Sequence, residues 1–259
     1  MGTTKATKSM GEEYYALRKQ LSEKAFSTVR NAAGFAAVLH EGQWRRAAAG
    51  IPKSPYINHP LRVAQLLADN GARSAIVATA LLHDTVEDCS KRFAELFLGV
   101  EPSTLTEEER RHRMVRHIAE QYGANIAETV SLLSLPESKY TGNAKQGGCS
   151  QITADAAAHA EYAEHVSNAV NGNTAALVVK FSDWIDNSAG VAELIDAESN
   201  PQRLMKLRKQ AAKYLSVADV LRSAERELTQ HVRDPGAFTV FMESKLDETQ
   251  QLLEELVAG

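Results

Sequence analysis

The most informative segment of the chain is ATALLHDTVEDC, at Ala78–Cys89. It continues an apolar run and then brings four ionisable residues close together: His83, Asp84, Glu87 and Asp88. Positions 83 and 87 are four apart, as are 84 and 88, so on a helix these side chains project from one broad face. Burying ionisable groups costs free energy unless they are paired or bind a metal. We therefore expect a helix from Ser74, as its N-cap residue, to Cys89 with a functional site on it; the alternative is a solvated helix face.

Helical spacing dominates the rest of the chain, and runs of period-2 alternation are absent, so we expect an all-α helical bundle. Local signals mark several helix ends, because Pro and the short polar residues favour the first turn and the N-cap. These signals are Pro60 in a first turn, Thr106 with Glu109 as a capping box, Asn200-Pro201 opening a helix through Leu221, and Asp234-Pro235 opening a last helix that ends near Leu256.

The chain shows no clear internal boundary. Asn171-Gly172 separates two helical patterns, Tyr14 to Ala25 has helical spacing, and Gly50–Ser54 and Lys139–Ser150 are expected to be loops. None of these segments is clear enough as a linker to split the chain into two domains. We expect a single domain over residues 1–259, with a motif-bearing core at about 25–225 and C-terminal helices at 201–257.

Composition excludes several classes of protein. The chain has 259 residues, 44% hydrophobic and 24% charged, which is ordinary for a globular protein and not for a disordered one. No run approaches the ~18 apolar residues of a membrane span. The net charge of −4 argues against a nucleic-acid partner. Residues 1–9 lack the apolar core of a secretory signal, and Cys89 and Cys149 lack CxxC spacing, so we expect a reducing, cytoplasmic location.

A second acidic group interrupts the apolar run AALVVKFSDWI at 175–185. Asp183 lies in this run, and Asp186 and Asn187 follow on the same helix face. An isolated aspartate of this kind is more often salt-bridged, here with Lys180, than a metal ligand. Together with His59, His83 and Asp84, however, it makes a set of two imidazoles and two carboxylates that suits Mn²⁺, Fe²⁺, Co²⁺ or Zn²⁺.

Four motifs in order resemble the hydrolase domain of RelA/SpoT homologues. They are HxGQxR at His40–Arg45, PYIxHP at Pro55–Pro60, ALLHDTVED at Ala80–Asp88, and KxxDxxxN at Lys180–Asn187. The resemblance implies an HD-domain helical bundle that depends on Mn²⁺ and removes the 3′-pyrophosphate of ppGpp or pppGpp. Because a synthetase and regulatory modules are absent from the sequence, the chain resembles a stand-alone small alarmone hydrolase.

The resemblance also implies roles for individual residues. The metal ligands would be His59, His83, Asp84 and Asp183, and Glu87 and Asp88 would position and activate the attacking water. Arg45 and Asn187 would contact the nucleotide. Arg208 and Tyr214 are further substrate-binding candidates, with a solvated helix face as the alternative for Arg208. The chain departs from the family at Asp186, where the family's DRLHN reads DWIDN and the usual residue is histidine.

Three alternatives stay open at this level. The same site could act on another pyrophosphorylated nucleotide or on a tRNA 3′ end, in an antitoxin linked to a partner toxin synthetase. It could belong to another HD-type nucleotide phosphohydrolase, which would release phosphate and not pyrophosphate. A protein with this fold could also bind a nucleotide without cleaving it, and the last helix could mediate a homo-oligomer.

Overall fold

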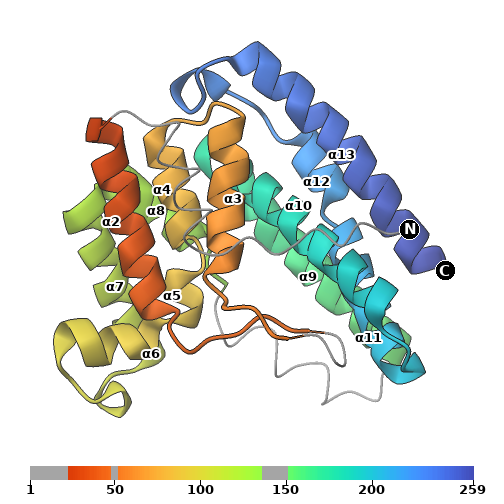
Figure 1. Ribbon diagram of the computed structural model, residues 1–259, viewed down its shortest axis with the longest axis horizontal. Coiled ribbons are helices and arrows are strands. Elements are labelled where there is room, and N and C mark those ends of the chain that lie inside the picture. The colour runs from red at the N-terminus through yellow and green to blue at the C-terminus, as the bar shows by residue number, and fades with distance from the viewer. Residues whose placement is uncertain (1–22, 48–51, 136–150) are drawn as a thin grey trace.

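The computed structural model describes residues 23–47, 52–135 and 151–259 (Figure 1). These residues form helices without a β-strand, which confirms the all-α prediction; two isolated bridges pair Trp44 with Pro55 and Ala72 with Val232. The predicted helical spacing from Tyr14 and the predicted loop at 139–150 lie outside the described residues, and the loop at 50–54 is described only from Pro52, where it is non-helical.

The helices of the described residues follow one another in this order along the chain. They are α2 (Glu23–Leu39), α3 (Asn58–Asp69), α4 (Ser74–Leu82), α5 (Thr85–Asp88), α6 (Ser90–Phe93), η1 (Ala94–Leu98), η2 (Pro102–Thr104), α7 (Glu107–Tyr122), α8 (Ala124–Leu133), α9 (Gln151–Val170), α10 (Thr174–Ala197), α11 (Pro201–Leu215), α12 (Ala218–Ser223), η4 (Leu228–Gln230) and α13 (Pro235–Ala258).

Two helices organise the core. Helix α4 packs against α2, α3, α8 and α10, and from Ile76 to Leu82 every residue is buried, as expected for a helix that is apolar on all sides. Helix α10 packs against α3, α9, α11 and α13, which lie around it in Figure 1. Because α4 and α10 also touch each other, residues at the end of one can meet residues in the middle of the other.

Several local signals hold in the structure. Thr106 and Glu109 form the predicted capping box, and the side chains of Asn200 and Asp234 accept hydrogen bonds from the first turns of α11 and α13. Gly172 takes a φ of 71°, a conformation that glycine adopts without strain, between α9 and α10. Each of these signals depends on residues within one helical turn, and tertiary packing has not overridden them.

The predicted helix from Ser74 to Cys89 is wrong in two respects. Ser74 is the first helical residue and Arg73 is the N-cap, without a side-chain cap. The helix also ends at Leu82, and α5 begins only at Thr85. His83 Nδ1 donates to the carbonyl of Ala80 at 2.7 Å, and Thr85 Oγ1 donates to that of Leu82 at 2.6 Å. Side chains thus satisfy carbonyls of the last helical turn.

The predicted helix from Asn200 to Leu221 is also interrupted. Helix α11 ends at Leu215, and α12 begins at Ala218. The Tyr214 carbonyl accepts hydrogen bonds from the Trp184 indole N–H at 2.9 Å and from the Val217 N–H at 3.2 Å. A hydrogen bond from Trp184 on α10 therefore satisfies a carbonyl group at the end of α11. No pattern within residues 200–221 could have indicated this contact.

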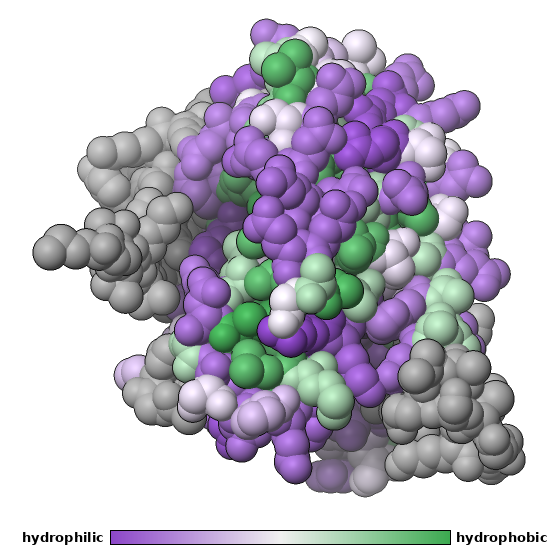
Figure 2. All heavy atoms as spheres, turned by 90° about the vertical axis from the view of Figure 1, so that its right-hand side faces the viewer, coloured by the Kyte–Doolittle hydropathy of each residue, from purple (hydrophilic) through white to green (hydrophobic). Residues whose placement is uncertain are grey.

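Helix α13 runs along the outside of the bundle, against α10, α11 and α12 (Figure 1). It buries Phe238, Met242, Leu246 and Leu253 on its inner face. Figure 2 shows the side of the molecule that carries this helix, where hydrophobic side chains lie in small groups among hydrophilic ones. No helix among the described residues is long and apolar enough to cross a bilayer.

Candidate metal centre

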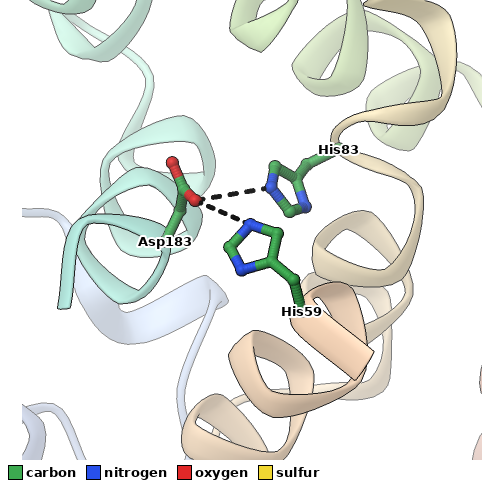
Figure 3. A group of neighbouring side chains, drawn as sticks. All are labelled: His59, His83 and Asp183. Carbon is green, nitrogen blue, oxygen red and sulfur yellow. Dashed lines mark ion pairs between the residues drawn. The ribbon is translucent and has the colours of Figure 1, made fainter. Parts of the chain in front are cut away.

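Three helices bring a cluster of metal-ligating side chains together. His59 lies in the first turn of α3, His83 directly follows α4, and Asp183 lies in the middle of α10. One ligand atom of each lies within 4.8 Å of the others, and the three side chains point toward one another in Figure 3. All three residues are buried, with relative exposures of 1%, 4% and 3%.

Both imidazoles direct Nε2 at the same carboxylate oxygen. Asp183 Oδ1 lies 3.0 Å from His59 Nε2 and 3.6 Å from His83 Nε2. Asp84 approaches the same two nitrogens, with Oδ1 3.1 Å from His83 Nε2 and Oδ2 3.5 Å from His59 Nε2. The structure therefore brings all four residues predicted as metal ligands to one point.

The donor set fits a divalent metal ion. His83 Nε2 is buried and makes no hydrogen bond within the described part of the chain, although two carboxylates are near it. A buried nitrogen without a hydrogen-bond partner costs free energy, unless a group from outside the protein, such as an ion, acts as its partner. Two imidazole nitrogens with carboxylate oxygens are the donors that Mn²⁺, Fe²⁺, Co²⁺ and Zn²⁺ accept.

The other ring nitrogen of each histidine fixes its tautomer. His59 Nδ1 lies 2.6 Å from Asp186 Oδ2, and His83 Nδ1 lies 2.7 Å from the Ala80 carbonyl. Both acceptors lack a proton, so each Nδ1 is the N–H donor. Once Nε2 has lost any proton that it carries, it is the nitrogen that can offer a lone pair to a cation.

The carboxylates set the charge of the site. Burial lowers the pKa of His59, but hydrogen bonds to Asp183 and Asp186 offset burial and leave this pKa raised. At His83 burial also lowers the pKa, but the charges of Asp84 and Asp183 outweigh burial and raise this pKa well above its ordinary value. Protons therefore compensate the carboxylates in the metal-free protein, and a divalent cation can replace them.

Asp183 is held by its own helix. Lys180 Nζ donates to Asp183 Oδ2 at 2.9 Å, and Asn187 Nδ2 donates to Oδ1 at 2.5 Å. The Asn187 amide oxygen accepts in turn from Arg45 Nη2 at 3.0 Å. Two predicted nucleotide-binding residues, Arg45 and Asn187, are thus linked to each other and to Asp183.

The HxGQxR segment supports the centre from the other side. The Tyr56 hydroxyl donates to Asp84 Oδ2 at 2.7 Å, and the His40 ring stacks on the Tyr56 ring with centroids 4.8 Å apart. His40 Nδ1 lies 2.7 Å from Gln43 Oε1. Gly42, between them, takes a φ of 81°, which a side chain would strain. This turn positions Tyr56, and Tyr56 positions Asp84.

Glu87 and Asp88 differ in their surroundings. Glu87 accepts a hydrogen bond from the Leu135 N–H at 2.9 Å, and burial raises its pKa to about 7. Asp88 is exposed as a residue. Partial desolvation of its carboxyl group and the charge of Asp84 nevertheless raise its pKa to about 6. Only Glu87 of the two lines the cavity beside the metal-ligating cluster.

This cavity has a volume of about 180 Å³. Its polar lining holds cations as well as acids, namely Arg45, Lys180 and Lys213 beside Asp84, Glu87 and Asp183. Tyr214 also lines it, with its hydroxyl accepting from Gln210 Nε2 at 2.9 Å. Arg208 does not line it: this residue lies in a separate, apolar depression between α11 and the end of α13.

Several residues of the site carried no assigned role in the sequence-based prediction. Tyr162 on α9 lines the cavity, with Lys213 Nζ 3.9 Å and Lys180 Nζ 5.4 Å from its ring centroid. Asp186 and Arg62 bind each other next to His59. Arg62 lies three residues after His59, so helical spacing would have placed it beside that predicted ligand, as it placed Asp186 beside Asp183.

No family model matches the chain. It is 46% identical over 72 residues to the guanosine-3′,5′-bis(diphosphate) 3′-pyrophosphohydrolase MESH1 of Xenopus tropicalis, which is 27% of this chain and 38% of that protein. It is 43% identical over 81 residues to the human protein of the same name, which is 30% of this chain and 44% of that protein. The matched segment thus spans less than half of these relatives.

The likeness extends to a bacterial protein and to a solved structure. The bifunctional (p)ppGpp synthase/hydrolase RelA of Mycobacterium tuberculosis is 38% identical over 78 residues, 30% of this chain and 10% of RelA. The structure of a metazoan ortholog of SpoT that hydrolyses ppGpp aligns with a TM-score of 0.53 and 16% identity, over 87% of this chain and 94% of that chain. The sequence matches confirm the resemblance to RelA/SpoT-type hydrolases, and the structural match confirms the fold.

Proposed function

We propose that this chain is a metal-dependent phosphohydrolase that removes the 3′-pyrophosphate of ppGpp or pppGpp and releases GDP or GTP. The observation that carries the proposal is the buried meeting of His59, His83, Asp84 and Asp183 beside a cavity lined by Glu87 and by cations. The local similarity to ppGpp pyrophosphohydrolases supports the choice of substrate.

We propose Mn²⁺ as the ion, held by the two Nε2 atoms and by the carboxylates of Asp84 and Asp183. When bound, such an ion would lower the pKa of a coordinated water and so supply a nucleophile at neutral pH. Asp186 and the Ala80 carbonyl hold the imidazoles in the required tautomer, and Tyr56 holds Asp84.

Glu87 is the proposed proton acceptor. Its side chain lines the cavity, and a pKa of about 7 lets the carboxylate take a proton and release it near neutral pH. The Leu135 N–H fixes the direction of the carboxylate. Asp88 is exposed and adds negative charge near the site. Its proposed role is to orient the attacking water through other water molecules that lie between them.

The cations of the cavity provide the substrate contacts. Arg45 can bind two phosphate oxygens with its guanidinium, while Lys180 and Lys213 act as point charges. A cavity of about 180 Å³ is smaller than the roughly 300–1,000 Å³ of sites that enclose a whole ligand. It therefore suits the reacting pyrophosphate group, with the nucleoside outside it. Such a substrate and the buried free thiol of Cys89 favour the cytoplasm as the location.

The test is an assay of the purified chain with ppGpp and Mn²⁺, with separation of the products. We expect GDP and pyrophosphate, and no turnover for His83→Ala or Asp183→Ala. Release of inorganic phosphate would indicate another class of HD phosphohydrolase. Parallel incubations with ppApp and with a 3′-pyrophosphorylated tRNA test the antitoxin alternative, and nucleotide binding without any product would refute an enzymatic role.

A further inference from the structure

We propose that Asp186 is a positioning residue that orients His59 and strengthens it as a metal ligand, with Arg62 holding Asp186 in place. This inference rests on the proposed metal centre and concerns how this chain builds it. Asp186 stands at the position where the resembled family usually has histidine. The exchange introduces a carboxylate directly behind a metal-ligating imidazole.

The hydrogen bonds of Asp186 exclude it from direct ligation. Its Oδ1 accepts from Arg62 Nε at 2.6 Å, and its Oδ2 accepts from Arg62 Nη2 at 3.0 Å and lies 2.6 Å from His59 Nδ1. Arg45 Nη2 lies 3.8 Å from the same Oδ2. Both oxygens thus face cationic or N–H groups, and Asp186 acts on the centre only through His59.

The pair with Arg62 gives Asp186 a fixed direction. A guanidinium that binds both oxygens of a carboxylate sets its plane as well as its position. Arg62 and His59 lie on α3, three residues apart, while Asp186 lies on α10, three residues after Asp183. The contact therefore joins the two helices that carry His59 and Asp183, at the point where their ligand atoms must meet.

The two imidazoles of the centre receive unequal support. His83 Nδ1 is held by a neutral backbone carbonyl, whereas His59 Nδ1 is held by a carboxylate with 11% side-chain exposure. A carboxylate partner increases the electron donation of the opposite ring nitrogen more than a carbonyl does. His59 is therefore the stronger nitrogen ligand of the pair, and its strength depends on Asp186.

The experiment measures metal affinity in the absence of substrate. Mn²⁺ is titrated by calorimetry into the metal-free wild-type chain, Asp186→Asn, and the matched control Asp196→Asn, which changes an exposed aspartate on the same helix. We expect Asp186→Asn to bind Mn²⁺ about 10–100-fold more weakly, with an unchanged circular dichroism spectrum, and the control to bind as the wild type does. Wild-type affinity in Asp186→Asn would overturn the inference.

A second measurement covers the case in which Asp186→Asn does not fold. The wild-type chain is labelled with ¹⁵N-histidine and loaded with Zn²⁺, which is diamagnetic, and the imidazole nitrogens are observed by NMR, with a His59→Gln sample to assign His59. We expect a proton on His59 Nδ1 and a metal-shifted Nε2. A metal-loaded His59 without a proton on Nδ1 would contradict the inference.

The outcomes separate this inference from the proposed function. A wild-type chain that binds Mn²⁺ but leaves ppGpp intact would refute the function, while the affinity comparison would still decide the role of Asp186. For an active chain, the half-saturating Mn²⁺ concentration of Asp186→Asn should rise by the same factor as its dissociation constant, with KM for ppGpp unchanged at saturating Mn²⁺. A change confined to KM would overturn the inference.

Discussion

Lys180 Nζ donates a hydrogen bond to Asp183 Oδ2 at 2.9 Å, so the two oxygens of this carboxylate face different partners. Oδ2 faces an ammonium group, and Oδ1 faces the imidazoles of His59 and His83. Burial raises the pKa of Asp183, but Lys180 and the two histidines lower it well below its usual value. One helical turn of α10 therefore supplies both a predicted acidic ligand and a charge that keeps it ionised.

Replacing Lys180 by methionine should destabilise the metal-free protein. The substitution removes one cationic partner of the buried Asp183, and loss of one partner of a buried ion pair costs about 3–5 kcal/mol. Urea unfolding measures this loss. Lys206→Met, at an exposed position of α11, should change the free energy of unfolding by about 0.5 kcal/mol or less. Equal effects of the two substitutions would mean that the Lys180–Asp183 pair has no special weight.

Substitutions at Asp84 and Glu87 should separate metal binding from turnover. Asp84→Ala removes a carboxylate that touches both imidazoles, and we expect it to abolish Mn²⁺ binding and activity. Glu87→Ala should leave Mn²⁺ affinity nearly unchanged and lower kcat by about 100-fold or more, the usual contribution of a general base. Calorimetry and a pyrophosphate-release assay check both, with Glu95→Ala as an exposed control. Loss of the metal in Glu87→Ala would contradict its assigned role.

Chelation should weaken the fold as well as the activity. A ligand that binds only the folded state stabilises it by about 2.7 kcal/mol at one hundred times its dissociation constant. We expect Mn²⁺ at that excess to raise the thermal midpoint of the wild-type chain and EDTA to reverse the rise. The midpoint of His59→Ala should be the same in both solutions. A metal-dependent shift that persists in His59→Ala would place the bound ion elsewhere.

The raised pKa of Glu87 predicts a pH dependence of stability in the metal-free protein. Its ordinary pKa of 4.5 applies to the unfolded chain, whereas the folded protein holds the proton until about pH 7. The folded state therefore binds more protons between these values, and the contribution of Glu87 to stability falls as the pH rises through this window, by about 3 kcal/mol in all.

Glu87→Gln should remove this fall. Urea unfolding in EDTA at pH 5 and pH 8 should show that the variant gains stability relative to the wild type at the higher pH. Glu128→Gln, at an exposed position of α8, should parallel the wild type at both values. A wild-type curve that matches the Glu87→Gln curve at both pH values would show that Glu87 titrates as it does in the unfolded chain.

The sequence predicted the parts of the structure that depend on local chemistry. The capping box at Thr106 and the caps at Asn200 and Asp234 were predicted correctly, since each depends on residues within one turn. Motif order, read through the family resemblance, selected His59, His83, Asp84 and Asp183, which the structure places together. Their roles as metal ligands remain predictions.

The remaining features depend on contacts between distant segments. The interruption after Leu82 is accompanied by His83 turning Nδ1 back to the Ala80 carbonyl, and the end of α11 by the Trp184 indole. Arg208 was a candidate substrate contact because of its charge, but the orientation of α11 places it in a different depression from the metal-ligating cluster. The orientation of a helix about its axis follows from packing that a linear pattern does not contain.

His83 and Asp84 lie between α4 and α5, and both keep right-handed helical backbone angles. Their side chains approach each other, with His83 Nε2 and Asp84 Oδ1 3.1 Å apart. A cation held there would cross-link α3, α4 and α10 much as a disulfide would, and it would resist their separation when the protein is pulled by force or attacked by proteases.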